Sequence, residues 1–477
     1  MIKPKFESAT SVKILINIGA TLDIPTGHFA KGLKGEYILN GGLAFLTGIT
    51  GIGNNFKSTI AHFMNLSAMN KIMESHESYY NTYDTEINIH EYTLKRFTVR
   101  FNSFKDKDIL ADGIWQITDK VKYPGEKWYE IYKQFSNDKE KDKSLSVDSP
   151  FLDRDNKSPV KIIIPSFGLA DSFSEFQTSD VMKLQDDNEL GESGGNMIHQ
   201  RQGLAKTRLL MEVPSLTASS YNYLTLTAHM GKENTIASGP YAPPPPKKLQ
   251  FLKHGDKMKG VTDKFTFNMN NCWHAFNAAP YTNQGTKGPE YPKSVEDNNT
   301  PNGDLFTVKL QQLRGKSGPT GIVLEVLVSQ SEGVLSELSE FHFIKNADRF
   351  GIGGNLQHFH LDLYPEVKLQ RTTIRNKLEE DPKLARAVNI TCEMAQMLHY
   401  WRHLTPNTIP SMSVLYETLK NKGYDWNTLL STRGYWTLNQ YTHPVPFLSS
   451  WDLIRMFKDE YTPYWLESDL KTIKKVF

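Results

Sequence analysis

The residues with the clearest chemistry lie in a glycine-rich segment, residues 48 to 59, which reads GITGIGNNFKST. Gly51, Lys57 and Ser58 match the phosphate-loop pattern GxxxxGK[ST], and Phe56 stands where the pattern has its second glycine. In such a loop, backbone amides surround a polyphosphate, the lysine reaches the outer phosphates, and the serine hydroxyl binds Mg²⁺. The predicted nucleotide contacts are Gly51, Ile52, Gly53, Asn54, Asn55, Phe56, Lys57, Ser58 and Thr59.

The flanking residues decide between this site and a surface turn that only caps a helix. Upstream, residues 43–47 (LAFLT) form an apolar run typical of a buried strand. Downstream, apolar residues recur at helical spacing, at Ile60, Phe63, Met64, Ala68 and Ile72. A loop between a strand and a helix is the context that a phosphate-binding site requires, so nucleotide binding is favoured over the turn.

Strand and helix patterns alternate from residue 43 to about residue 228, which predicts an α/β fold with a mainly parallel sheet. The four strand candidates are residues 43–47, 79–83, 160–164 and 223–227. In such sheets ligands bind beyond the carboxyl ends of the strands. The residues that directly follow each strand are therefore the ones to examine for chemistry.

Two of these strand ends carry candidate catalytic residues. The second predicted strand, residues 79–83, is followed by Asp84, Thr85 and Glu86. A carboxylate that faces the phosphate loop can orient the water that attacks a γ-phosphate. The alternative is a helix cap followed by an exposed glutamate. The fourth predicted strand, residues 223–227, is followed closely by His229, which we predict as a γ-phosphate sensor. The alternative is a histidine that only satisfies local hydrogen bonds.

The third predicted strand lacks the aspartate that normally holds magnesium through water in a phosphate-loop ATPase. Residues 160–164 run directly into Pro165 and Ser166, and Asp171 comes only later. We therefore predict Ser58 and Ser166 as the Mg²⁺-contacting residues. The missing carboxylate also leaves open a slow or inactive ATPase.

Two similar β-rich units follow, at residues 306–326 and 343–361. Each carries a lysine and an arginine before a glycine-rich turn, which predicts two β-hairpins. From residue 367 the pattern becomes helical, with helices expected at 382–403, 414–422 and 451–458. The predicted organisation is an N-terminal segment (1–40) for packing between protomers, a core with a β-hairpin extension (41–366) and a helical C-terminal domain (367–477).

Composition narrows the class of protein. Of 477 residues, 39% are hydrophobic and 23% charged, and the net charge is +2, so any basic surface must be local. No run of about 18 apolar residues predicts a membrane span. The N-terminus lacks the pattern of a secretory signal, and the two cysteines, Cys272 and Cys392, lie far apart. These features predict a cytoplasmic protein, without membrane partners, in a reducing compartment.

The order of these motifs resembles the RecA-type ATPase core, and most closely the bacteriophage recombinases of the UvsX type. Those recombinases have phenylalanine before the phosphate-loop lysine, as at Phe56, and a strand ending in aspartate, a hydroxyl residue and glutamate, as at 84–86. Residues 24–27 (IPTG) are similar to the segment that opens the RecA core. The resemblance covers about residues 20 to 290. It implies an ATP- and Mg²⁺-dependent recombinase that forms filaments on single-stranded DNA, with Glu86 as the water-activating base, Lys57 as a catalytic residue and His229 in place of the family's glutamine. In a phage protein the compartment is the infected host's cytoplasm.

In that family the loops after the third and fourth strands contact DNA. Here those positions hold two long polar segments, 168–203 and 231–262. Cations in these segments suit a phosphate backbone, although simple solvation of a lysine-rich loop remains the alternative. The predicted DNA contacts are Arg201, Lys247, Lys248, Lys253, Lys257 and Lys259.

Residues 313–321 (LRGKSGPTG) resemble a different family, the replicative helicases of the DnaB type, in which arginine and lysine reach the ATP of a neighbouring subunit. We therefore predict intersubunit roles for Arg314, Lys345 and Arg349; the alternative is a charged hairpin turn. The leading hypothesis is a recombinase in homologous recombination and repair. The alternatives are a ring-forming helicase and a catalytically weak nucleotide-binding scaffold.

Overall fold

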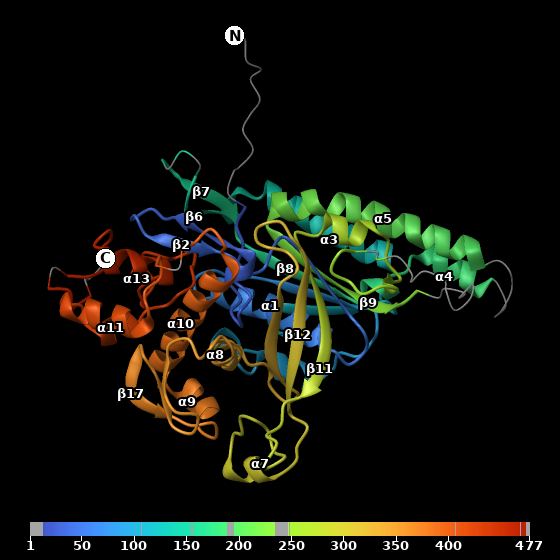
Figure 1. Ribbon diagram of the computed structural model, residues 1–477. Coiled ribbons are helices and arrows are strands. Elements are labelled where there is room, and N and C mark those ends of the chain that lie inside the picture. Colours follow the sequence, from blue (N-terminus) through green and yellow to red (C-terminus); the bar gives the residue numbers. More distant parts are fainter. Residues whose placement is uncertain are drawn as a thin grey trace.

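The computed structural model describes residues 13–105, 107–153, 155, 157–187, 195–233, 247, 249–405, 407–467 and 469–473. Over this part of the chain the fold is mixed α/β, built around a ten-stranded sheet (Figure 1). Its strands, from one edge to the other, are β14 (Gly333–Val334), β13 (Val323–Ser329), β12 (Leu305–Gly315), β11 (Asn271–Pro280), β3 (Leu46–Gly51), β9 (Asn222–Lys232), β8 (Ser166–Asp171), β4 (Tyr80–Asp84) and β5 (Trp115–Asp119), while β10 (Asp256–Lys259) pairs with β9.

The strands from β11 to β5 are parallel to one another, whereas β12, β13, β14 and β10 join antiparallel. The prediction of an α/β fold is thus confirmed, and the sheet contains both parallel and antiparallel strands. Helices cover both faces, as parallel strands require. One face carries α1 (Lys57–Ile72) and α2 (Glu91–Thr98), and the other carries α3 (Gly125–Lys141), α5 (Gly195–Ser220) and α6 (Lys264–Asn268).

Helix α1 is the helix that the apolar spacing predicted. The same five apolar residues, at 60, 63, 64, 68 and 72, are buried, and Asn65 donates from the helix to Thr225 Oγ1 on β9 at 3.0 Å. Strand β3 runs further than expected, to Gly51, so that residues 48–51 belong to the strand and the loop is shorter. The strand, loop and helix that the phosphate-loop motif needs are all present.

The prediction for the third strand was wrong. Residues 159–163 form β7, which pairs with β6 (Ser146–Leu152) in a separate hairpin, and the strand that enters the large sheet is β8. The alternating burial of β7 belongs to a half-exposed hairpin, whereas every residue of β8 is buried. Gly168 gives β8 a weak strand pattern but allows Tyr132 and Leu224 to pack closely against its backbone.

The prediction for the second hairpin was also wrong. The first unit does form a hairpin, β12–β13, but residues 343–346 belong to α8 (Ser336–Asn346). A small sheet follows, made of β15 (Ile352–Gly354), β16 (Phe359–Leu361) and β17 (Tyr364–Leu369). Six of the eleven residues of α8 are buried, namely Leu338, Ser339, Glu340, Phe341, His342 and Ile344, a pattern that a sequence resemblance to the first unit concealed.

The helical C-terminal region is confirmed. It contains α9 (Ile374–Glu380), α10 (Pro382–Tyr400), α11 (Met412–Asn421), α12 (Trp426–Leu430) and α13 (Ser450–Phe457). Side chains from these helices share one core cluster with Ile24, Leu39, Leu305 and Leu327, so this region packs directly on the N-terminal segment and the β12–β13 hairpin. The boundary expected at residue 366 falls inside β17.

The N-terminal residues also pack inward. Short 3₁₀ helix η1 (Ile24–Thr26) precedes a hairpin of β1 (His28–Lys31) and β2 (Tyr37–Asn40). Ile14, Ile16 and Ile18 are buried in the same cluster as β3 and α1. Within the described residues, this segment is part of the main body.

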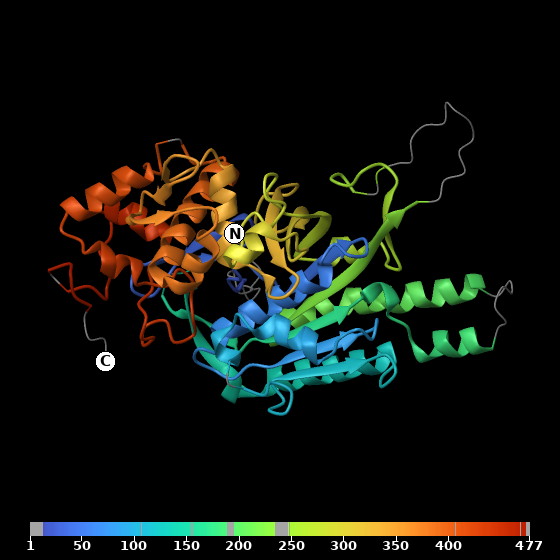
Figure 2. The same cartoon turned by 90° about the horizontal axis from the view of Figure 1, so that it is seen from below.

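The polar segment 168–203 is largely helical where it is described. It holds the end of β8, helix α4 (Ser179–Asp186) and the start of α5. Figure 2 shows α4 and the first turns of α5 extending away from the body of the molecule, while the later part of α5 packs Leu209, Leu210 and Val213 against the sheet. The remaining short helix, α7 (Val295–Asn299), lies between β11 and β12.

Candidate nucleotide site

The loop between β3 and α1 is anchored to the neighbouring strand β11. A side chain at Gly51 would place its Cβ 2.8 Å from the carbonyl oxygen of Ala275, and Asn55 Nδ2 donates to that same oxygen at 3.2 Å. Only glycine fits at residue 51, because the backbones approach so closely. Ile52, in contrast, is 54% exposed at the tip of the loop. The loop therefore has a fixed base and an open tip.

Phe56 has a clear structural role. Its backbone lies in the left-handed region (φ 56°, ψ 21°) at the N-cap of α1, which explains why related loops carry glycine there. A non-glycine residue in this conformation costs roughly 1 kcal/mol. The ring packs against Phe306 on β12, with 5.0 Å between ring centroids, and this contact offsets the cost.

Phe56→Gly and Phe56→Ala should therefore differ in stability. Both lose the Phe306 contact, but only alanine keeps a Cβ in the left-handed conformation, so we expect Phe56→Ala to be less stable than Phe56→Gly by about 1 kcal/mol. Urea denaturation of both variants measures the difference. Equal stabilities would mean that the positive φ is not maintained in solution.

The three predicted catalytic side chains lie together at the carboxyl edge of the sheet. Glu86 Oε1 is 3.9 Å from Lys57 Nζ and 3.1 Å from His229 Nε2. The strand register explains this, since Gly51 at the end of β3 pairs with His229 on β9. Hydrogen bonding to His229, and after it the charge of Lys57, holds the pKa of Glu86 below its ordinary value against the effect of burial. Glu86 is thus a carboxylate held between two basic groups.

Asp84 and Thr85 position Glu86. The Asp84 carboxylate accepts four backbone N–H groups, from residues 86 to 89, at 2.8 to 3.0 Å, so it caps the loop that follows β4. Thr85 donates its hydroxyl to the carbonyl of Ser172 and accepts the Ser172 N–H. Of the three residues, Glu86 is the one whose carboxylate lies beside Lys57 of the loop, while Asp84 caps the backbone that follows β4.

The aspartate that seemed to be missing is Asp171, the last residue of β8. In the sheet it pairs with Asp84, which places it at the same carboxyl edge as the phosphate loop. Burial raises the pKa of Asp171, and hydrogen bonds from the hydroxyls of Ser58 and Thr227 oppose that rise. The contact between Ser58 and Asp171 is the pairing that a phosphate-loop site uses to hold Mg²⁺.

Ser166 was wrongly predicted as a metal-contacting residue. It begins β8, at the opposite end of the strand from Asp171, and pairs with Asn222 at the start of β9. Its hydroxyl donates to Asn222 Oδ1 at 3.0 Å and accepts from Lys139 Nζ at 2.7 Å. The error followed from the wrong third strand, which moved the expected strand end five residues or more from its true position.

The donor set fits Mg²⁺ bound jointly with phosphates. Within the described residues no group of three or more His, Cys, Asp or Glu side chains forms a cluster that would hold a metal by itself. Mg²⁺ commonly uses one or two protein ligands, water and substrate phosphates, which matches Ser58 and Asp171. The buried hydroxyl of Thr50, at the end of β3, has no hydrogen-bond partner and adds an unsatisfied polar group beside the loop.

The three predicted intersubunit residues do not form one group. Arg314, near the end of β12, pairs with Cys272 at the start of β11, and its guanidinium lies 5.9 Å from the Phe267 ring. Lys345 Nζ lies 3.3 Å from Glu290 Oε1, within the chain. Arg349 donates to the carbonyls of Gly354 and Asn355. The intersubunit role stays a prediction, now without the repeat that supported it.

The predicted DNA contacts lie at two places. Arg201 is exposed on the projecting helix α5, and four exposed lysines lie beyond β9: Lys247, Lys253, Lys257 and Lys259. Lys248 lies outside the described residues. Phe251, in the same segment as these lysines, packs against Gly321 of the β12–β13 hairpin.

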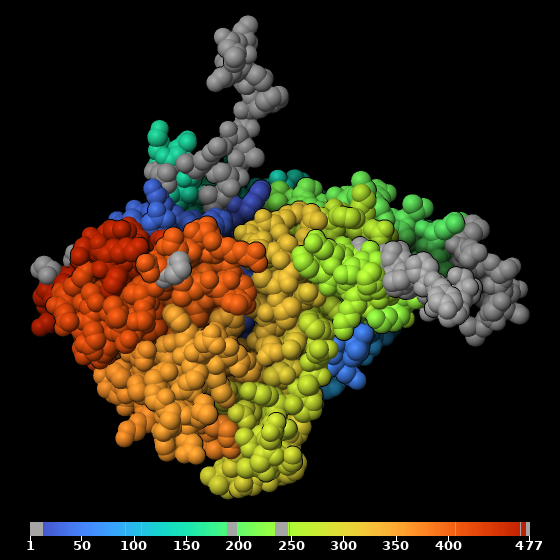
Figure 3. All heavy atoms as spheres, viewed as in Figure 1, coloured from blue at the N-terminus to red at the C-terminus, as the bar shows by residue number. Residues whose placement is uncertain are grey.

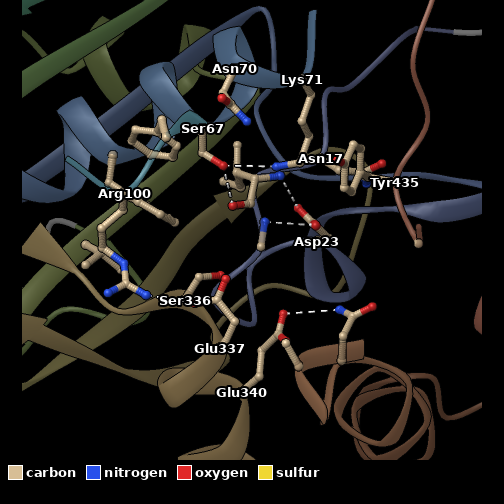
Figure 4. Close-up of a pocket in the computed structure, with 18 of the residues that line it drawn as sticks. Asn17, Asp23, Ser67, Asn70, Lys71, Arg100, Ser336, Glu337, Glu340 and Tyr435 are labelled. Atoms are coloured by element: carbon tan, nitrogen blue, oxygen red, sulfur yellow. Dashed lines mark hydrogen bonds and ion pairs between the residues drawn. The ribbon is translucent and has the colours of Figure 1, made fainter. Parts of the chain in front are cut away.

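A polar cavity of about 420 Å³ lies between α1, the start of α8 and the first half of α10 (Figure 4). Lys71 donates to Ser67 Oγ at 3.0 Å, and Asp23 accepts the N–H groups of Ile18 and Gly19. On the opposite wall Asn389 donates to Glu340. Thr59, predicted as a nucleotide contact, is among the residues that line this cavity.

The acids of this cavity predict an unusual dependence of stability on pH. Burial raises the pKa of Asp23 to about 7, and burial with the charges of Glu337 and Glu393 raises the pKa of Glu340 well above its ordinary value. As pH rises, the unfolded chain releases these protons first, so the folded state loses relative stability. We expect the melting temperature to fall between about pH 5 and about pH 8.

Glu340→Gln should weaken that dependence and stabilise the protein at the higher pH, by on the order of 1 kcal/mol. The matched control is Glu380→Gln, an exposed glutamate on the neighbouring helix α9. Melting curves across this pH range test the prediction. A Glu340→Gln variant with the wild-type pH profile would show that Glu340 ionises normally in the folded protein.

The fold and the site together define an α/β protein with a phosphate loop, a carboxylate held beside its lysine, and an aspartate beside its serine. No protein-family model matches this chain, and no curated protein sequence matches it either. None of the helices among the described residues is long and apolar enough to cross a membrane.

Proposed function

We propose that this chain is an ATP-dependent recombinase that binds single-stranded DNA and self-associates on it, acting in homologous recombination and repair. The observation that carries the proposal is the convergence of Lys57, Glu86, His229 and Asp171 at the phosphate loop. A structural or signalling nucleotide site needs the lysine and serine, but not a carboxylate in the position of a water-activating base.

The strand order supports the RecA-type core that the motifs resemble. The phosphate-loop strand β3 lies between β11 and β9, followed by β8 and β4, all parallel. The expected base follows β4 and the expected aspartate ends β8. These two positions are the ones that the resemblance implies, which supports the proposal.

Each side chain has a role in the proposed hydrolysis. Lys57 contacts the outer phosphates of ATP and moves away from Glu86, whose Oε1 lies 3.9 Å from Lys57 Nζ in the structure. Glu86 then orients the attacking water, and His229 keeps its carboxylate ionised and in position. Mg²⁺, when bound, neutralises the phosphate charge; Ser58 and Asp171 are the residues that would hold it.

A short chain of contacts connects this site to the predicted DNA-binding lysines. His229 pairs with Lys259, and Gly231 with Lys257, in the ladder between β9 and β10. The backbone N–H of His229 donates to Ser174 Oγ at 2.8 Å, and that hydroxyl donates to the Lys259 carbonyl at 2.7 Å. A shift of His229 on nucleotide binding therefore moves the strand that carries the lysines.

The alternatives now differ in support. The scaffold hypothesis depended on the absent aspartate, and Asp171 removes that argument. The helicase hypothesis depended on two similar hairpins, but Lys345, in the second unit, lies on helix α8 and not on a hairpin strand. Closed rings in electron microscopy would favour the helicase hypothesis.

ATP turnover measured with and without single-stranded DNA tests the proposal. We expect DNA to stimulate turnover and electron microscopy with ATP and DNA to show filaments. Closed rings would favour the helicase, and turnover that DNA leaves unchanged would contradict both DNA-dependent functions.

A further inference from the structure

A large groove lies away from the phosphate loop, between the β1–β2 hairpin, the tip of the β12–β13 hairpin and the end of α10. Its volume is about 980 Å³. Residues 317–323 form one wall and residues 399–403 form another, with Trp451 from α13 at the base. Figure 3 shows the β12–β13 hairpin (yellow) beside the segment around the end of α10 (orange) on the same face of the molecule.

Aromatic rings form a connected series along this groove. Phe29 stacks on Trp451, with 5.8 Å between centroids and 27° between planes, and meets the edge of Trp401 at 5.7 Å. Trp401 in turn stacks on His403 at 5.9 Å and 22°. Phe29, Trp401 and Trp451 are each half-buried and His403 is exposed, so the series is packed on one side and open on the other.

Arg402 is the charged side chain among the described residues that line this groove. The groove carries Arg402 and three histidines, His28, His399 and His403, and no aspartate or glutamate is among its described lining residues. Ser317 and Thr320 add hydroxyl donors from the glycine-rich hairpin tip. A surface that combines stacked rings, an arginine, imidazoles and hydroxyls, without carboxylates, is complementary to a ligand with flat bases and anionic phosphates.

We propose that this groove binds a segment of single-stranded DNA, with bases stacking on the Trp401–His403 end of the aromatic series and phosphates contacting Arg402. The proposal rests on the proposed function, because it extends the path of the same DNA. Continuity supports that path: Gly321 of the hairpin tip lines the groove and also contacts Phe251, which belongs to the lysine-bearing segment that ends in β10. The hairpin tip thus lies between the lysines and the groove.

The groove is open between separate segments of the chain, which favours a strand over an enclosed free nucleotide. Pockets for small ligands occupy roughly 300 to 1,000 Å³ and enclose most of the ligand. Here the volume is at the upper end and three separate segments form open walls. A polynucleotide that passes through satisfies both features.

Binding of a fluorescein-labelled oligothymidylate to the full-length protein tests the proposal. We expect Arg402→Glu to weaken binding roughly tenfold and to lower the slope of affinity against salt concentration. The matched control is Lys458→Glu, which reverses an exposed cation after α13, outside the groove. We expect DNA to quench the tryptophan fluorescence of the wild-type protein. A second variant, Trp401→Phe, should lose the part of this quenching that comes from Trp401, while its phenylalanine ring preserves packing.

The outcomes separate this proposal from the proposed function. Wild-type protein that fails to bind the oligonucleotide would overturn both. Wild-type protein that binds it, with Arg402→Glu binding equally well and Trp401→Phe quenched equally, would overturn the groove alone. If Arg402→Glu instead breaks up self-association without DNA, as measured by light scattering, the groove holds a second copy of the chain and the DNA proposal fails.

Discussion

Replacing Lys57 with alanine is expected to lower ATP turnover by about 10² to 10³ and to weaken ATP binding, because one positioned donor at a developing phosphate charge supplies that much. The reason is local. Lys57 is the first residue of α1, 7% exposed, and its nearest described charge is Glu86. Its removal takes away the cation that contacts phosphate and leaves the Glu86 carboxylate facing the nucleotide without its partner.

A control is needed because Lys57 also begins a buried helix. Lys71 lies near the other end of α1 and faces the polar cavity, so Lys71→Ala removes a lysine from the same helix at a distance from the loop. Turnover and equilibrium binding of a fluorescent ATP analogue separate the two variants. Equal losses in both would point to destabilisation of α1, and full binding with DNA-stimulated turnover in Lys57→Ala would refute the assignment of the loop.

Local patterns in the sequence were sufficient for the central unit of the fold. The spacing of apolar residues from Ile60 to Ile72 is a helical period, and the run before Gly48 is short and apolar, so both elements follow from side-chain geometry. The same holds for α10 and α11. In each case the burial that stabilises the element is visible in a few consecutive residues.

The prediction of the third strand was wrong because the burial of the true strand depends on residues that are distant in the sequence. Strand β8 lies between β4 and β9 with every residue buried, so its sequence, SFGLAD, needs no alternation and tolerates a glycine. The more strand-like residues 159–163 lie in a peripheral hairpin. An aspartate directly after a buried run, Asp171, was the available signal for the correct strand.

Individual residues of the candidate site could be predicted from the sequence, but the contacts between distant segments could not. The motif placed Lys57 and Ser58, and strand ends placed Glu86 and His229. Nothing local shows that Lys259 pairs with His229, or that four segments between residues 27 and 451 line one groove. Those relations depend on strand register and on tertiary packing over hundreds of residues.

Glu86→Gln is expected to lower ATP turnover by about 10² to 10⁴ while ATP binding is retained or becomes tighter. In the structure Asn88 Nδ2 donates to Glu86 Oε2 at 3.2 Å. Glutamine keeps the size of the side chain and an acceptor for this hydrogen bond, but it cannot take up a proton. It also removes the negative charge that lies 3.9 Å from Lys57 Nζ, so Lys57 becomes freer to contact phosphate. Catalysis and binding should therefore change in opposite directions.

Asn88→Ala is the control for the surroundings of the carboxylate, since it removes the hydrogen bond to Glu86 Oε2 and leaves the carboxylate in place. Single-turnover hydrolysis, with ATP binding measured separately, distinguishes the two variants. We expect Asn88→Ala to retain most of its turnover, because His229 still holds Glu86 through Oε1. If Glu86→Gln hydrolyses ATP at the wild-type rate, the base is another group. If it loses binding and turnover equally, Glu86 maintains the shape of the loop and has no part in activating water.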